Sequence, residues 1–388
     1  MKGVICEETA RLGSQVYHNR LRSVVLTGSL ARDEGTFVKD EAGVRLLGDA
    51  EFLLVFDPRV ALPKAGDVAV IRQKVEERIL RRGVRADVTL SAVKPNYLQR
   101  LPPSIFGYEL LACGKIVAGD ADVLGLIPRF TLADIPLQDA WRLLANRLVE
   151  QLETVDELLG GRPTLSPDAH YRTVKLYLDM ATSLLVFLGG YAPTYEARAR
   201  SLTQLAEMAA PTPLPFPLSR FAKDVSGWTA WKLNGYGVVA DADRTFWERA
   251  IGYAEALWAW ELAHLHERNG DTALMASLIR HQPLSARLRG WAHVVRQRGW
   301  HRSWRLWPRW LRQASQGSPR HLVYRAASTL VFELNAGADT PRLRSVVRRV
   351  RRDLPVAPPA GGVEDDSPSA LAATILANYR SFLRETRA

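Results

Sequence analysis

The chain has 388 residues, 47% hydrophobic and 24% charged, with a formal net charge of +11. These proportions exclude a wholly disordered chain and are typical of two or three folded domains. Two cysteines exclude a disulfide framework, and no apolar run approaches the roughly 18 residues of a membrane-spanning helix. The first residues also lack the pattern of a secretory signal. We therefore expect a soluble, cytoplasmic protein with reduced thiols.

The first hundred residues alternate helical and strand patterns. The sequence predicts a helix over 6–20, a strand in "SVVLTGS", a strand in "AEFLLVFD", a helix over 67–82 and a strand in "VRADVTLSAV". Residues 32–47, between the first two strands, are interpreted as a hairpin that turns at Gly43. In the helix over 67–82, the buried face is expected to carry Val70, Val75, Ile79 and Leu80.

The pattern changes after Pro136 to long helical stretches over 138–159, 167–189, 195–209 and 244–267, with a proline-rich break in "APTPLPFPLS". The fold class predicted is α+β, a mixed sheet backed by helices and followed by a mainly helical domain. The expected divisions are a core over 1–130, a helical domain over 131–354, a linker over 355–368 and a last helix over 369–388.

Three carboxylates lie on neighbouring predicted strands. Asp49 and Glu51 are two residues apart, so both point to one face of a strand, with Ala50 on the other face. Asp87 begins the next predicted strand, which would place it beside the pair. Carboxylates held this closely favour a hard divalent cation that also binds substrate phosphates. We expect a magnesium site, and two such ions would suit in-line displacement of pyrophosphate.

The Gly28-Ser29 pair ends the first predicted strand. Without a side chain, Gly28 lets the backbone approach a phosphate closely, and the Ser29 hydroxyl can donate to a phosphate oxygen. The pair therefore indicates a nucleoside triphosphate as ligand.

This order of strand, Gly-Ser, Asp-x-Glu, helix and strand with a third Asp resembles the DNA-polymerase-β-type nucleotidyltransferase superfamily. The resemblance covers residues 20–95, and "YELLACGKIVAGD" is similar to the segment that often follows that core. It implies transfer of a nucleoside monophosphate from an NTP, ATP foremost, to an acceptor hydroxyl. Asp49 and Glu51 would bind both Mg²⁺ ions, with Mn²⁺ as an alternative, Asp87 would bind the catalytic ion, and Gly28 and Ser29 would hold the triphosphate.

The chain departs from that pattern in two places. The interval between Ser29 and Asp49 is longer than in minimal members, and position 51 is Glu in place of Asp, a change that many members share. Neither change removes a ligand, so we expect an active enzyme.

The helical half offers further candidates. In the superfamily this domain commonly lends a basic residue to the triphosphate and an aromatic residue to the base. Lys175 and Tyr171 lie four residues apart on one helical face and fit these two roles. Arg32 is either a phosphate contact or a structural arginine, and Tyr195 with Arg198 either borders the acceptor or packs in the core.

The positive charge is concentrated in residues 280–352. Within it, segment 287–313 alternates arginine with Trp291, Trp300, Trp304, Trp307 and Trp310. Such a segment can bind nucleic acid, lie on an anionic membrane surface, or pack its indoles in the core, and we favour the core.

Three functions follow from these patterns. The first is an enzyme that nucleotidylates a small hydroxylated molecule, like the antibiotic nucleotidyltransferases. The second is a cyclic-oligonucleotide synthase or an RNA-tailing enzyme. The third is a non-catalytic nucleotide-binding module.

Overall fold

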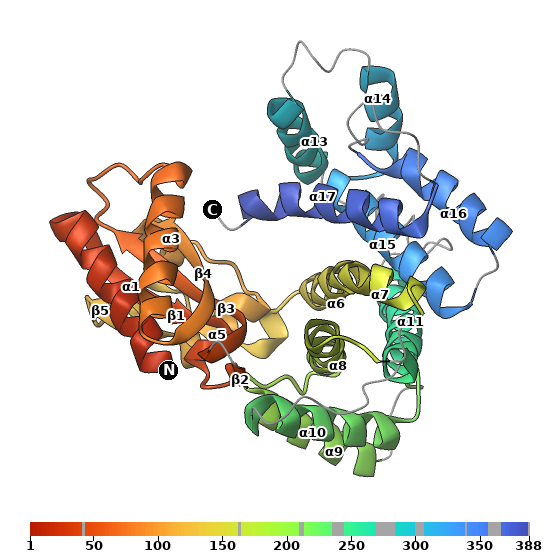
Figure 1. Cartoon of the computed structure of the whole chain (residues 1–388), viewed down its shortest axis with the longest axis horizontal. Helices are drawn as coiled ribbons and strands as arrows, with labels where there is room; N and C mark the ends of the chain where they lie inside the picture. The colour runs from red at the N-terminus through yellow and green to blue at the C-terminus, as the bar shows by residue number, and fades with distance from the viewer. Residues whose placement is uncertain are drawn as a thin grey trace.

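The computed structural model describes residues 1–40, 43–161, 164–208, 213–234, 244–267, 284–298, 306–337, 340–355 and 366–386. A sheet region forms from the N-terminal third, and helices form the remainder (Figure 1). The predicted mixed architecture, a small sheet followed by a helical region, is therefore confirmed.

The sheet has five strands, built around one long central strand. The strands are β1 (Leu21–Thr27), β2 (Thr36–Asp40), β3 (Gly43–Phe56), β4 (Val84–Val93) and β5 (Lys115–Gly119). Strand β3 pairs antiparallel with β1 and β2 and parallel with β4, while β5 pairs antiparallel with β1. Strand β3 has β1, β2 and β4 as neighbours, so side chains from these three strands lie next to those of β3.

The predicted hairpin is formed by β2 and the start of β3. Asp40 pairs with Gly43, and the register continues to Thr36 opposite Leu47. Gly43 has φ +119°, a conformation that side chains oppose, which explains a glycine at this turn. The hairpin accounts for the long interval between Ser29 and Asp49.

Helices cover both faces of the sheet. Helices α1 (Lys2–Tyr17) and α3 (Ala65–Arg81) pack on the face that carries Phe52 and Leu54, whereas α4 (Pro95–Gln99) and α5 (Ile105–Cys113) cover part of the other face. Alternate residues of β3 thus enter different cores, as expected for a buried strand.

The predicted face of α3 is partly wrong. Val75 and Ile79 are buried, but Val70 and Leu80 are each 53% exposed, and Ile71 is buried instead. Residues 71, 75 and 79 follow one another at intervals of four, so they form a single narrow stripe against the sheet. Val70 and Leu80 lie beside that stripe and face outward.

The helical region is arranged around α8 (Pro167–Phe187), which is buried on nearly every side. Helix α8 packs against α6 (Leu137–Gln151), α9 (Tyr195–Glu207), α10 (Leu218–Asn234) and α11 (Arg244–Glu267) (Figure 1). The stretch predicted as one helix over 138–159 is divided, because the short turn Leu152–Thr154 separates α6 from α7 (Val155–Leu159). Helix α10 was not predicted.

The C-terminal helices are α13 (Leu284–Arg298), α14 (Trp307–Gln316), α15 (Pro319–Asn335), α16 (Thr340–Asp353) and α17 (Pro368–Thr386). Helix α17 confirms the predicted last helix and packs on α15 and α16. Most of the predicted linker, residues 356–365, lies outside the described residues. No helix in the described part of the chain combines the length and apolar character needed to cross a membrane.

Two tryptophans of the basic segment belong to the helical core. Trp291 and Trp310 are buried, and their indole N–H groups donate to the carbonyl oxygens of Gly317 and Pro355, each at 2.9 Å. The core interpretation is confirmed for these two. Trp307 is half-buried, and Trp300 and Trp304 lie outside the described residues.

Candidate functional site

The sheet brings the three carboxylates to neighbouring positions. Asp49 on β3 pairs directly with Asp87 on β4, and Glu51 pairs with Thr89. Ala50 is fully buried, so Asp49 and Glu51 share the opposite face, as predicted. The Thr89 hydroxyl donates to Asp49 Oδ2 at 2.8 Å, which orients the Asp49 carboxylate.

The Gly-Ser turn lies against Glu51. Strand β1 ends at Thr27 opposite Glu51, and the short helix α2 (Gly28–Ala31) follows at once. Gly28 has φ +69°, and a Cβ atom there would lie 2.6 Å from Glu51 Oε2. The positive φ favours glycine at position 28, and a side chain there would displace the carboxylate end of Glu51, a candidate metal ligand.

A cavity of about 680 Å³ lies between the sheet and the helical region. Apart from Asp87, the predicted site residues all line it: Gly28, Ser29, Arg32, Asp49 and Glu51 from the sheet region, and Tyr171 and Lys175 from α8. Asp87 lines an adjoining cavity of about 590 Å³, and Gly48 borders both. Residues far apart in sequence therefore line one cavity.

The three carboxylates are suitable metal ligands by chemical type, but their side chains do not converge on one point. Among the residues that the structure describes, no three His, Cys, Asp or Glu side chains converge closely enough to hold a metal ion. Asp87 is exposed and opens onto the adjoining cavity. Mg²⁺ is usually held by one or two carboxylates together with water and substrate phosphates, so Asp49 and Glu51 would be sufficient protein ligands once a triphosphate is bound.

Arg32 has a structural environment. Its side chain is only 4% exposed, its Nε donates to Glu34 Oε2 at 2.6 Å, and its guanidinium forms a second ion pair with Glu109. The Tyr195 ring lies 5.1 Å from the guanidinium carbon. Because two carboxylates engage this group, Arg32 is better suited to holding the turn in place than to binding phosphate.

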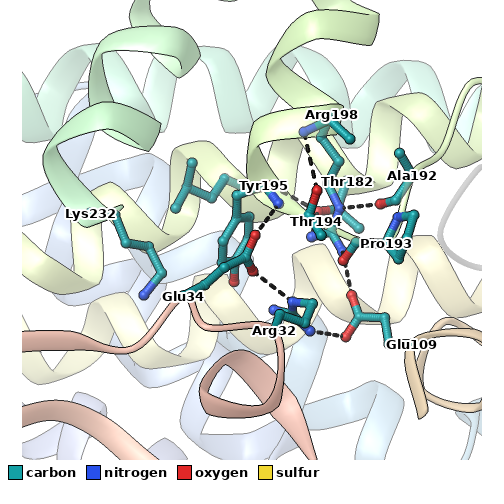
Figure 2. Close-up of polar contacts among 12 residues, drawn as sticks. Arg32, Glu34, Glu109, Thr182, Ala192, Pro193, Thr194, Tyr195, Arg198 and Lys232 are labelled. Carbon is teal, nitrogen blue, oxygen red and sulfur yellow. Dashed lines mark hydrogen bonds and ion pairs between the residues drawn. The ribbon is translucent and has the colours of Figure 1, made fainter. Parts of the chain in front are cut away.

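Figure 2 shows how this network continues into the helical region. Glu34 Oε1 accepts a hydrogen bond from the backbone N–H of Tyr195 at 2.5 Å, at the first turn of α9. Arg198 donates to Thr182 Oγ1 and to the carbonyl oxygens of Ala192 and Pro193, and it pairs with Glu109. These buried contacts favour the packing interpretation of Tyr195 and Arg198.

Tyr171 and Lys175 share the cavity-facing side of α8, as predicted. The Tyr171 hydroxyl lies near Gly48, where a Cβ atom would come within 2.9 Å of it. Lys175 Nζ is 5.8 Å from the centre of the Tyr171 ring. Burial raises the pKa of Tyr171, so its hydroxyl stays protonated.

Lys232 on α10 also lines the cavity, and the sequence interpretation missed it. Its side chain is buried, and Nζ donates to Thr36 Oγ1 and to the Tyr171 hydroxyl, each at 3.2 Å. Burial, followed by the neighbouring Lys175 charge, lowers the pKa of Lys232 to about 7. One local signal could have indicated it: Lys232 lies at helical spacing on the same face of α10 as Phe221, Val225 and Thr229, all of which are buried.

Fold and site together define a mixed α/β protein with a cavity that is acidic on the sheet side and basic on the helical side. No family model matches the chain, and no match was found among curated proteins or solved structures. The function must therefore be argued from the residues around the cavity.

Proposed function

We propose that the protein is a metal-dependent nucleotidyltransferase that moves a nucleoside monophosphate from an NTP to an acceptor hydroxyl, with release of pyrophosphate. One observation carries the proposal. The Gly28-Ser29 turn, Asp49 and Glu51 open onto the same cavity as Tyr171 and Lys175, which come from a helix far along the chain. A phosphate-binding turn, carboxylates and cations around one cavity are the groups that phosphoryl transfer requires.

Each group has a distinct task in this reaction. The absent side chain of Gly28 lets the backbone approach the triphosphate, and the Ser29 hydroxyl donates to a phosphate oxygen. Asp49 and Glu51, joined by Asp87, would hold Mg²⁺, with Mn²⁺ as an alternative. When bound there, the ion would supply positive charge beside the phosphates and the acceptor oxygen. Thr89 keeps the Asp49 carboxylate oriented toward its task.

The cavity favours a small acceptor. Its volume of about 680 Å³ lies within the range of small-molecule sites. Tyr97, Leu101 and Phe106 add an apolar part to the lining, which suits a base or an apolar part of the acceptor. These features support modification of a small hydroxylated molecule.

An RNA-tailing enzyme is the second candidate, and the surface of α16 favours it. Arg344, Arg348 and Arg352 border an exposed hollow of about 330 Å³ far along the chain from the sheet. A row of exposed arginines can neutralise successive phosphates of a nucleic acid. The same catalytic residues would then act on the end of a bound RNA.

The test is incubation of the purified protein with each labelled NTP and Mg²⁺, alone, with RNA, and with hydroxylated small molecules. We expect pyrophosphate release together with a labelled small molecule. Labelled RNA or a cyclic product would instead identify a polymerising enzyme. Binding of NTP without any product under all conditions would contradict the proposal and identify a non-catalytic binding module.

A further inference from the structure

Two lysines of the cavity differ from most of the arginines beside them. Among the described residues, the cavity-lining arginines that pair with carboxylates are Arg32, Arg142, Arg147 and Arg198. Within the residues that the structure describes, neither Lys175 nor Lys232 forms an ion pair. The two lysines therefore carry charge that no carboxylate of the described chain neutralises directly, as does Arg320 at another part of the lining, whose Nε donates to the Tyr324 hydroxyl.

Lys232 is held in place by neutral groups. Its Nζ donates to the hydroxyls of Thr36 and Tyr171, and it lies 5.1 Å and 5.5 Å from the ring centres of Tyr171 and Tyr195. An ammonium group has three donors, so these two hydrogen bonds leave one for a ligand. Figure 2 shows the Lys232 side chain beside Tyr195, extending from α10 toward the segment that carries Glu34.

Such a position is unfavourable for a lysine without an anionic ligand. The residue is only 1% exposed, and burial of a charge is costly unless an opposite charge compensates it. Lys175 comes from a different helix and adds like-charge repulsion. An anion in the cavity would relieve both costs together, because it would contact both ammonium groups.

We propose that Lys175 and Lys232 form a two-lysine anion site that binds the polyphosphate chain of a nucleotide, with inorganic pyrophosphate as the smallest ligand that occupies it. The identity of the natural ligand as an NTP rests on the proposed function. Binding of pyrophosphate does not, because it requires no turnover.

The site should take up a proton when it binds an anion above neutral pH. In the free protein, the pKa of Lys232 is about 7, lowered by burial and then by Lys175. The other charged or titratable groups that face it are Asp179 and Tyr171 on α8, Glu34 and Arg32 from the segment before β2, and Tyr195 on α9. A bound anion favours the ammonium form and raises this pKa. Affinity should therefore be highest below pH 7 and fall as the pH rises above it.

The experiment is calorimetric titration of the full chain with pyrophosphate, with and without Mg²⁺, at pH 6 and pH 8. Two buffers with different ionisation enthalpies report the protons exchanged. Because pyrophosphate itself exchanges protons in this pH range, the informative quantity is the difference between the wild type and Lys232→Met: we expect the wild type to take up as much as about one proton more at pH 8, and close to the same number at pH 6. Lys232→Met should weaken binding by about tenfold or more and lack this additional uptake.

Two further variants separate the lysines from general charge effects. Lys175→Met should also weaken binding, but it should move the proton uptake to higher pH, because the pKa of Lys232 rises when its neighbour is removed. Lys223 is exposed on α10, the helix that carries Lys232, and does not line the cavity. Lys223→Met should therefore bind pyrophosphate as the wild type does. If Lys232→Met does not fold, Lys232→Gln takes its place in the comparison.

Three outcomes would overturn the two-lysine site: no pyrophosphate binding by the wild type, wild-type affinity in both lysine variants, or wild-type binding at pH 8 that takes up no more protons than binding by Lys232→Met does. Failure of the proposed function would look different. A wild-type protein that binds pyrophosphate with this additional proton uptake, but forms no product from any NTP, would retain this site and refute the nucleotidyltransferase.

Discussion

Asp49 is the residue on which the proposed chemistry depends most. Asp49→Asn removes one charge and one acceptor oxygen from the candidate metal site, so we expect metal-dependent transfer to fall by at least about 100-fold. The remaining amide oxygen can still accept the hydrogen bond from Thr89, so the melting temperature should stay close to that of the wild type. Product formation and thermal unfolding measure the two effects. A folded variant with normal turnover would remove Asp49 from the mechanism.

Gly28 is expected to tolerate no side chain. Its φ is +69°, and a Cβ atom at this position would lie only 2.6 Å from Glu51 Oε2. Gly28→Ala should therefore cost about 1–2 kcal/mol of stability and weaken the binding of a non-hydrolysable NTP analogue. Gly66→Ala on α3 is the matched control, because a Cβ atom there meets nothing within 4 Å. Urea denaturation and calorimetry should separate the two variants, and equal behaviour would make the Gly28 turn an ordinary one.

Local sequence pattern identified the sheet residues but not their partners. The two-residue spacing of Asp49 and Glu51 fixes a common face, and the structure agrees. The partner of Arg32, Glu109, is 77 positions away, and nothing in the local pattern links the two. Lys232 was missed for a similar reason: its place on the helical stripe is the local signal, but its contacts depend on how α10 packs against α8 and β2.

At the scale of elements, Glu34 connects the segment after the Gly28-Ser29 turn to α9. It accepts a hydrogen bond from Tyr195 N and pairs with Arg32, with both side chains of the pair 4% exposed. Glu34→Gln leaves a buried guanidinium with less compensation, and we expect a loss of about 3 kcal/mol in the free energy of unfolding. Glu196→Gln breaks an exposed pair with Arg200 on the same helix and should cost less than about 1 kcal/mol. Similar costs for both would show that Glu34 is no anchor.

The exposed side of α16 predicts binding to a polyanion. Arg344, Arg348 and Arg352 recur at intervals of four on the outer side, while Val346, Val347 and Val350 anchor the helix in the core. Replacing the three arginines with alanine should weaken RNA binding and reduce the slope of log affinity against log salt by about 2. The buried valines are unchanged, so the fold should persist.

A control with the same change of charge tests whether the position matters. Arg72, Lys74 and Arg81 are exposed on α3, and their replacement with alanine should leave the salt dependence of RNA binding unaltered. Binding to anionic vesicles but not to RNA would instead assign the basic surface to a membrane. Loss of affinity in both triple variants would indicate a general effect of net charge.

Elements with a strong period were predictable and those defined by packing were not. Strands β1, β3 and β4 lie close to the predicted strand segments, and the long helices α8 and α11 lie close to the predicted helical stretches. Helix α10 begins within a proline-rich stretch that favours a loop interpretation, and it was missed. The predicted buried face of α3 differs from the observed one, because Val70 and Leu80 are apolar but lie outside the stripe that contacts the sheet.

In the whole molecule, the sheet and the helical region are joined around the cavity. Thr36 meets Lys232, Glu34 meets Tyr195, and Arg45 on β3 pairs with Asp168 on α8. These contacts connect segments more than 100 positions apart, so sequence patterns could predict both regions without predicting how they meet. The position of the cavity is a property of the assembled chain.

This arrangement leads to a prediction about unfolding of the full chain. A ligand that contacts both regions stabilises both, and at 100 times its Kd it adds about 2.7 kcal/mol to the free energy of unfolding. We expect a non-hydrolysable NTP analogue with Mg²⁺ to raise the melting temperature by several degrees and to move every unfolding transition of the chain upward. Differential scanning calorimetry measures this directly, and Asp49→Asn with Lys175→Met should greatly reduce the shift, since one change acts on each wall of the cavity. A ligand that moved only the transition of the sheet region would show that the helical wall, with its two lysines, takes no part in binding.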